Sequence, residues 1–226
     1  MNRLMASPLA VPEPALALWA HPDAAVVPHT DRSIPTVYLA ADLPGAEQLI
    51  RTAGWNAVNL VALSTLFDGG EISTPSCLVM DISSFESSAL HQRLAGLGAE
   101  MTFICTADEV DLAMVVEIVR AGALDVIQKP VVGDALLQAV RRALLRSEAA
   151  LEQSRNDRRL RDRLGTLSLR ERQVMILASS GLLNKQIAAE LGISEITVKA
   201  HRGRVMRKME ARSFAGLVKM AMVLKL

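Results

Sequence analysis

A tight turn at Gly192 separates two short helical patterns, and this arrangement constrains the fold more than any other feature of the sequence. The first pattern follows Asn184, a residue type that often caps helices, and its apolar residues recur at helical spacing until Gly192. Ser194, which is another common cap, precedes the second pattern. Two short helices joined by such a turn predict a helix-turn-helix between Leu183 and Met209.

The second of these helical patterns has an apolar face and a basic face. The apolar face comprises Val198, His201, Val205 and Met209. The opposite face and its flanks comprise Lys199, Arg202, Gly203, Arg204 and Arg207. Lysine and arginine donate hydrogen bonds to base acceptors and pair with phosphates, so the pattern predicts insertion into the major groove of DNA. The alternative, for this helix taken alone, is an ordinary amphipathic helix whose basic face is only solvated.

Two further helical patterns flank this pair and favour the DNA-binding interpretation. Upstream, Ser168 is predicted to cap a helix with Glu171 as its capping-box partner, and Gly181 ends that helix. Downstream, Ser213 is predicted to cap a last helix whose inner face is apolar. Four short helices close together along the chain therefore predict a compact all-α DNA-binding unit.

The charged residues divide the chain into two parts of opposite sign. Of the 25 basic and 24 acidic side chains, 19 and 8 respectively lie from Arg141 onward, so the net charge of +1 conceals an asymmetry. The preceding part is left with 6 basic and 16 acidic side chains. Such a distribution indicates a basic nucleic-acid-binding module joined to an acidic domain that has a different task.

The block from Leu167 to Leu224 resembles the LuxR/FixJ-type helix-turn-helix family, through the runs "LSLRERQV", "NKQIAAELGIS", "TVKAHRGRVMRKM" and "LVKMA". The resemblance implies that the residues nearest to base edges are Lys199, Ala200 and Gly203. It implies that the DNA backbone is held by Lys185, Thr197, Arg204 and Arg207, with Ser194 as a neutral donor. Gly203 departs from the longer polar side chains of many relatives, which transfers specificity to its neighbours, above all to Arg202.

The acidic part alternates short apolar runs with helical patterns. The predicted strands are residues 36–40, 56–62, 77–81, 101–105 and 124–128. The predicted helices are residues 46–52, 64–68, 87–97 and 111–121, with another after Gly133. Five such units predict an α/β fold, a five-stranded doubly wound parallel sheet of the flavodoxin-like kind with helices on both faces.

Polar residues follow four of the predicted strands, namely Asp42, Asp81, Thr106 and Lys129. Each alone is an unremarkable loop residue, but together they resemble the phosphoacceptor receiver domain of two-component response regulators, over residues 34–146. The resemblance implies that Asp81 accepts a phosphoryl group and that Asp42 and Asp81 hold Mg²⁺. It also implies that Thr106 and Lys129 contact the phosphoryl oxygens, whose spread charge has to be neutralised.

The receiver-like part departs from that family where phosphorylation takes place. Ala41 replaces one of two acids, Val126 replaces an aromatic residue, and Phe85 and Ala89 replace a proline and a glycine. The loop after Thr106 is longer and adds an acidic cluster that consists of Asp108, Glu109 and Asp111. Fewer carboxylates imply weaker Mg²⁺ binding, and extra negative charge repels a phosphoryl group. We therefore expect weakened or absent control by phosphorylation; a conventional phosphorylation switch at Asp81 is the alternative.

Composition and pattern divide the chain into four segments. They are an Ala/Pro-rich extension (1–33), a receiver-like domain (34–146), a helical linker (147–164) and the helix-turn-helix domain (165–226). Leu137, Leu144 and Leu151 recur every seven residues, with Val140 between the first two, and predict a short dimer seam. The alternative is that the first half of this long helix packs on the sheet of its own domain.

Several other classes of protein are disfavoured. Cys77 and Cys105 lack disulfide or metal-binding spacing and are interpreted as small core residues. No apolar run is long enough to span a membrane, and prolines interrupt the start of the chain, so we expect no membrane association and a cytoplasmic location. No nucleophile constellation accompanies the strand-end residues, which argues against an enzyme.

These patterns predict a sequence-specific, homodimeric transcription regulator of the response-regulator type. Its expected partners are double-stranded promoter DNA, RNA polymerase and a sensor histidine kinase. The alternative is a protein-binding switch that titrates a kinase or another regulator and contacts DNA only secondarily.

Overall fold

The computed structural model describes residues 34–60, 66, 72–82 and 101–226. It divides the chain into two compact units, Met1–Leu151 and Glu152–Leu226. The predicted extension 1–33, the predicted helix 87–97, most of the predicted helix 64–68, and the departures at Phe85 and Ala89 lie outside the described residues. No helix in the described part of the chain is long and apolar enough to cross a membrane.

The first unit contains the predicted five-stranded parallel sheet, with the strand order β2-β1-β3-β4-β5. The strands are β1 (Thr36–Ala40), β2 (Asn56–Asn59), β3 (Ser76–Asp81), β4 (Met101–Ala107) and β5 (Asp125–Gln128). β2 ends at Asn59, after pairing with the first four residues of β1, and the last two residues of the predicted strand, 61 and 62, lie outside the described residues. β4 is longer than predicted because its last residue, Ala107, pairs with Gln128 of β5.

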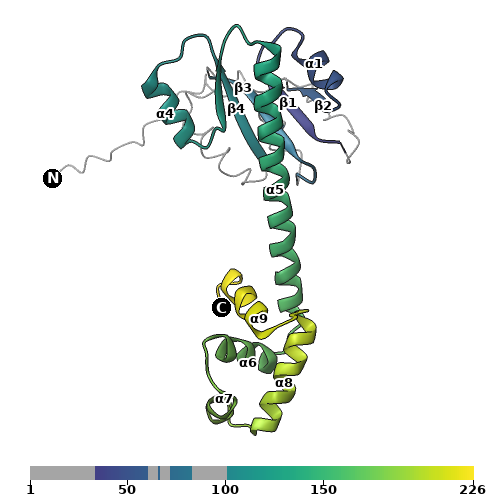
Figure 1. Cartoon of the computed structure of the whole chain (residues 1–226), viewed down its shortest axis with the longest axis vertical. Coiled ribbons are helices and arrows are strands. Elements are labelled where there is room, and N and C mark those ends of the chain that lie inside the picture. Colours follow the sequence, from purple (N-terminus) through teal and green to yellow (C-terminus); the bar gives the residue numbers. More distant parts are fainter. Residues whose placement is uncertain (1–33, 61–65, 67–71, 83–100) are drawn as a thin grey trace, which may run out of the picture. The chain divides into compact units, whose positions relative to one another are not determined.

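Different helices cover the two faces of this sheet (Figure 1). α1 (Ala46–Thr52) and α5 (Gly133–Gly165) pack on one face, where Ile50 and Val140 contact β-strand side chains such as Val79. α4 (Leu112–Arg120) packs on the other face, where Ile118 joins Phe103. Burial from both sides explains why the central strands are continuous apolar runs rather than alternating patterns.

Two of the three heptad leucines of α5, Leu144 and Leu151, are buried within the chain and are therefore not available to the predicted dimer seam, whereas Leu137 is half-buried. Leu144 lies in the core of the first unit together with Val140, and Leu151 is also buried within the single chain. The first half of α5 therefore packs on its own sheet, as the alternative held. A hydrogen bond from the backbone N–H of Ser76 to Oγ of Ser147, 2.9 Å long, fixes α5 against the start of β3. The seven-residue spacing reflects packing within the chain.

The second unit contains the end of α5 and the four predicted helices that follow it. They are α6 (Leu169–Ser179), α7 (Asn184–Leu191), α8 (Glu195–Lys208) and α9 (Phe214–Val223). The predicted serine caps are confirmed, since Ser194 and Ser213 each accept a hydrogen bond, 3.1 Å long, from the backbone three residues later. Gly192 has φ 65°, a left-handed conformation that glycine adopts without strain and that allows the tight turn into α8.

Asn184 is not the cap of α7, contrary to the prediction. It is the first residue of that helix, and the cap position belongs to Leu183. The Leu183 backbone N–H donates to Oε1 of Gln186 over 2.8 Å, which satisfies one of the free groups at the helix start. Oδ1 of Asn184 accepts instead from Arg202 of α8. A partner distant in sequence has thus displaced the local capping bond.

The predicted capping box at α6 is confirmed and is extended by an ion pair. Glu171 accepts from the backbone N–H of Ser168 over 2.9 Å, and Oγ of Ser168 accepts from the Glu171 backbone. Nζ of Lys208, at the end of α8, donates to the same carboxylate over 2.6 Å. Glu171 is only 4% exposed. The hydrogen bond from Lys208, followed by that from Ser168, lowers the pKa of Glu171 to about 2.

We expect the second unit to lose stability in acid through Glu171. Its folded pKa of about 2 lies below the ordinary value of 4.5, so its contribution is complete above pH 4.5 and is lost as the pH falls toward 2. Glu171→Gln removes a charged hydrogen-bond acceptor and should cost about 1.5–3 kcal/mol at neutral pH. Amide hydrogen exchange of α6 and α8 in the full chain, corrected for the intrinsic pH dependence, measures both effects.

Glu190→Gln is the matched control, because Glu190 is exposed on α7. This variant should leave the acid sensitivity of α6 and α8 unchanged. Equal acid sensitivity in Glu171→Gln and the unmodified chain would contradict the assignment.

Candidate functional site

The ends of β3, β4 and β5 bring together Asp81, Thr106 and Lys129. Asp81 is the last residue of β3 and lies beside Thr106 in the register of β3 and β4. Lys129 follows β5 directly, and its ammonium group forms an ion pair with the Asp81 carboxylate. Carboxyl ends of parallel strands meet at one edge of a sheet, which explains how residues far apart in sequence converge here. A carboxylate, a hydroxyl and a cation are thus grouped at one site.

The acidic loop after β4 also reaches Lys129. Oδ2 of Asp108 lies 3.4 Å from Nζ of Lys129, and Nε2 of Gln128 donates to the backbone oxygen of Asp108 over 3.3 Å. The hydrogen bond with Asp81, assisted by the one with Asp108, raises the pKa of Lys129 above its ordinary value. The cation therefore stays charged and is shared between two carboxylates. Sequence reasoning predicted Asp108 only as a source of repulsion, because its contact with Lys129 spans 21 residues.

Thr106 and Cys105 are buried beside this site, whereas Cys77 is buried near the start of β3. The Thr106 hydroxyl donates to the backbone oxygen of Met80 over 3.4 Å. Burial, with a smaller effect from Asp81, raises the pKa of the neighbouring Cys105 to about 12. Burial also raises the pKa of Cys77. Both thiols stay protonated in the core, as the interpretation as core residues requires.

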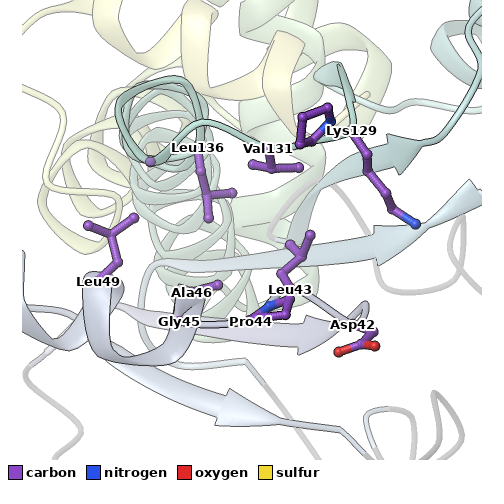
Figure 2. A pocket seen from close by; sticks show the side chains of 11 residues that line it. Asp42, Leu43, Pro44, Gly45, Ala46, Leu49, Lys129, Val131 and Leu136 are labelled. Atoms are coloured by element: carbon purple, nitrogen blue, oxygen red, sulfur yellow. The ribbon is translucent and has the colours of Figure 1, made fainter.

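Asp42 is exposed in the loop after β1. Together with Lys129 it lines a cleft of about 420 Å³, whose apolar lining includes Leu43, Leu49 and Leu136. Figure 2 shows Asp42 and the Lys129 side chain extending away from these leucines. Within the described residues no three histidine, cysteine or acidic side chains are grouped so as to hold a metal ion. Two carboxylates still suit Mg²⁺, which proteins commonly bind through one or two carboxylates together with water.

The exposed face of α8 carries most of the residues predicted to contact DNA. Those that are exposed on α8 and its cap are Ser194, Thr197, Lys199, Ala200, Gly203, Arg204 and Arg207. Lys185 is exposed on α7. Val198 and Val205 on the opposite side of α8 are buried in the core of the unit, so the helix is held by its apolar face. The basic side chains are therefore exposed to solvent on one side of the helix.

Arg202 differs from the other basic residues of α8, because it is half-buried and engaged within the unit. Its Nη1 donates to Oδ1 of Asn184 over 2.7 Å, and its guanidinium carbon lies 4.6 Å from the ring centre of Phe214. The side chain thus links α8 to the starts of α7 and α9. Neither partner was identified from the sequence, although Asn184 and Phe214 each lie at the start of a helix.

We expect Arg202→Ala to destabilise the second unit and to weaken binding to all DNA sequences by the same factor. Loss of a charged hydrogen bond and of the contact with the Phe214 ring should cost about 1.5–3 kcal/mol. Arg204→Ala, at an exposed neighbour, should change stability by less than about 0.5 kcal/mol. Amide exchange of α7 and α9, with fluorescence anisotropy on related and random duplexes, separates the two effects. A selective loss of cognate binding with intact stability would instead indicate a base contact.

Comparisons with known proteins agree with both units. The model of the family described as "Bacterial regulatory proteins, luxR family" matches residues 165–221. Nodulation protein W of Bradyrhizobium diazoefficiens is 38% identical over 175 residues, which cover 76% of this chain and 77% of that protein. Response regulator protein TmoT of Ectopseudomonas mendocina is 34% identical over 205 residues, which cover 87% of this chain and 92% of that protein.

A solved structure is similar over nearly the same extent. The low-resolution structure of the response regulator StyR has a TM-score of 0.69 and 31% identity, and the match covers 84% of this chain and 99% of that one. The receivers of such proteins typically use Mg²⁺ in phosphorylation, and the family consists of transcription regulators, not enzymes. The chain therefore belongs to the response regulators, as a DNA-binding transcription regulator with a luxR-family helix-turn-helix domain.

Proposed function

We propose that the chain binds double-stranded promoter DNA as a homodimer, through the exposed face of α8. The observation that supports this proposal best is the accessible row of Lys199, Arg204 and Arg207 on a helix whose other side is buried. Such a face suits insertion into the major groove. We retain the four segments, 1–33, 34–146, 147–164 and 165–226, as the proposed domain boundaries.

The proposed contacts divide into two kinds. Lys199, Ala200 and Gly203 are assigned to base edges, as the resemblance to the LuxR/FixJ-type family implies, and all three are exposed. The phosphate contacts are assigned to Lys185, Ser194, Thr197, Arg204 and Arg207. The Ser194 hydroxyl already caps α8 and lies 2.8 Å from the Thr197 hydroxyl, so these two hydroxyl groups form one polar group for a phosphate. Arg202 links α8 to α7 and α9 through its contacts with Asn184 and Phe214.

The proposed dimer surface lies on α4 rather than on the heptad leucines. Leu112, Val116 and Val119 are exposed and recur four and seven residues apart, so they form one apolar stripe. Leu112 is 80% exposed in the single chain. A second copy that covers the stripe would remove this apolar surface from water, which stabilises the dimer. A symmetric dimer of this kind would bring two helix-turn-helix domains to paired half-sites.

The proposed receiver site is a weakened phosphoacceptor. Asp42 and Asp81 are the carboxylates for a weakly held Mg²⁺, because Ala41 supplies none. Asp108 competes for the Lys129 ammonium group, which a phosphoryl group at Asp81 would also need. A sensor histidine kinase is the proposed phosphoryl donor. The intact pair of Asp81 and Lys129 favours the second candidate, a conventional phosphorylation switch.

We expect slow or absent labelling of the full chain by acetyl phosphate with Mg²⁺. Asp81→Asn should change DNA affinity by less than about tenfold, which corresponds to 1.4 kcal/mol. Ala41→Asp restores a carboxylate and should increase both Mg²⁺ affinity and labelling. Rapid stoichiometric labelling that Asp81→Asn abolishes, together with a large rise in DNA affinity on phosphorylation, would establish the conventional switch instead.

RNA polymerase is the further proposed partner, since a promoter-bound regulator acts on transcription. The cytoplasm is the proposed location, because the promoter DNA of bacteria lies there.

The alternative, a protein-binding switch, is tested by measuring how DNA affinity depends on salt concentration. A regulator that neutralises phosphates loses DNA affinity steeply as salt rises. Binding of a protein partner without salt-dependent DNA binding would support the switch.

A further inference from the structure

The exposed face of α8 carries an apolar residue on its midline, in the first turn of the helix. Ile196 lies in the first turn and is 79% exposed. Ala200, Gly203 and Arg207 follow it at intervals of four, seven and eleven residues, so these four residues form one stripe along the helix. The buried Val205 lies nine residues after Ile196, half a turn away from this stripe. Ile196 therefore points away from the core, in the middle of the face assigned to DNA.

Ile196 belongs neither to the cap of α8 nor to the adjacent hydrophobic core. The cap of α8 is formed by the Ser194 hydroxyl and the Thr197 backbone. The adjacent core consists of residues such as Val198 and Ile193, and Ile196 is not part of it. A β-branched residue also has a lower helix propensity than alanine. Single exposed apolar residues are ordinary on protein surfaces, so the position of Ile196 among the DNA-contacting residues is what distinguishes it.

DNA offers one apolar group to such a side chain in the major groove. Thymine carries a C5 methyl group there, whereas the other bases present hydrogen-bond donors and acceptors. In helix-turn-helix complexes the N-terminal residues of the second helix contact the base edges. Lys199 and Arg204 lie on the two flanks of the stripe, where they can contact phosphates or base acceptors while Ile196 approaches the methyl group.

We propose that Ile196 is a specificity-determining residue that packs against the C5 methyl group of a thymine in each half-site, with Ala200 beside it. The inference rests on the proposed binding of DNA by α8 and names one base that this face selects. Burial of one methyl group corresponds to about fourfold in affinity per half-site. A cytosine at this position leaves the isoleucine against a polar amino group, so the preference is for a T·A pair.

The test removes the methyl group without changing base pairing. Selection from random double-stranded DNA with the full chain gives an operator, in which each thymine is then replaced singly by deoxyuridine. Fluorescence anisotropy at fixed salt measures the dissociation constants of the unmodified chain, Ile196→Ala, Ile196→Val, Ala200→Gly and the control Leu169→Ala. Leu169 is the matched control, because it is 75% exposed in the first turn of another helix, α6.

We expect one thymine per half-site at which deoxyuridine lowers affinity about fourfold for the unmodified chain and for Leu169→Ala. Ile196→Ala should bind the two operators equally, and Ile196→Val should keep most of the difference. An undiminished difference in Ile196→Ala, or its loss only in Ala200→Gly, would overturn the role of Ile196. Salt-dependent binding to the selected operator tests DNA binding by α8 separately from the thymine contact of Ile196. If this binding is absent, both proposals are wrong; if it is present without an effect of Ile196→Ala, only the thymine contact is wrong.

Discussion

Leu112→Glu is expected to convert the proposed dimer of this chain into a monomer and to lower its affinity for a paired operator by about 100-fold. Leu112 is the most exposed residue of the α4 stripe, so a charge there should not disturb the core of the first unit. In the dimer the same charge would be buried without a partner, which is strongly unfavourable. Light scattering at tens of micromolar and anisotropy on operators with one or two half-sites measure the two effects.

Affinity for a single half-site should remain unchanged in Leu112→Glu, because α8 is untouched. Val132→Glu is the control: Val132 is 66% exposed in the loop before α5, so this variant adds the same charge outside α4. It should remain dimeric. A monomeric state of the unmodified chain at this concentration, with or without DNA, would remove the proposed dimer, and a dimeric Leu112→Glu would move the interface away from α4.

Lys199→Ala is expected to weaken cognate DNA by about 5- to 150-fold, which corresponds to 1–3 kcal/mol for a lost base contact. The loss should concentrate at one base step, since only the base edge distinguishes cognate from other DNA. Arg207→Ala should instead weaken all sequences alike and reduce the salt slope by about 1. Anisotropy titrations at several salt concentrations, on the selected operator and on random duplexes, separate base contacts from phosphate contacts.

Equal binding of the operator by Lys199→Ala and the unmodified chain would exclude a base-contacting role for Lys199. A selective loss of operator binding in Arg207→Ala would move that role to Arg207. Lys199 and Arg207 both lie on the exposed face of α8, so each variant is the internal control for the other.

The features that the sequence predicts well depend on neighbours in the chain. The caps at Ser168, Ser194 and Ser213 and the turn at Gly192 are formed by bonds between residues at most five positions apart. Hydrophobic periodicity likewise identifies the buried side of α8, because Val198 and Val205 repeat with the period of the helix. The parallel sheet is predicted because short apolar runs alternate with helical patterns along the sequence.

The features that the sequence predicts less well depend on competition between distant residues. Asn184 has good local capping chemistry, but Arg202, 18 residues away, binds its side chain. The spacing of Leu144 and Leu151 fits a dimer seam, but the protein's own fold buries both residues first. A periodic apolar pattern specifies which face of a helix avoids water and does not specify whether the covering surface belongs to the same chain.

The sequence by itself determined the order of the helices and strands that the structure describes, the basic face of α8 and the four strand-end residues of the receiver. These properties follow from local backbone preferences and from spacing along the chain. Only the tertiary structure decided which groups share a partner: Lys129 lies between Asp81 and Asp108, and Lys208 reaches Glu171 across 37 residues. The physical reason is that an ion pair or hydrogen bond depends on distance in space, which the packing of helices on a sheet or on one another sets.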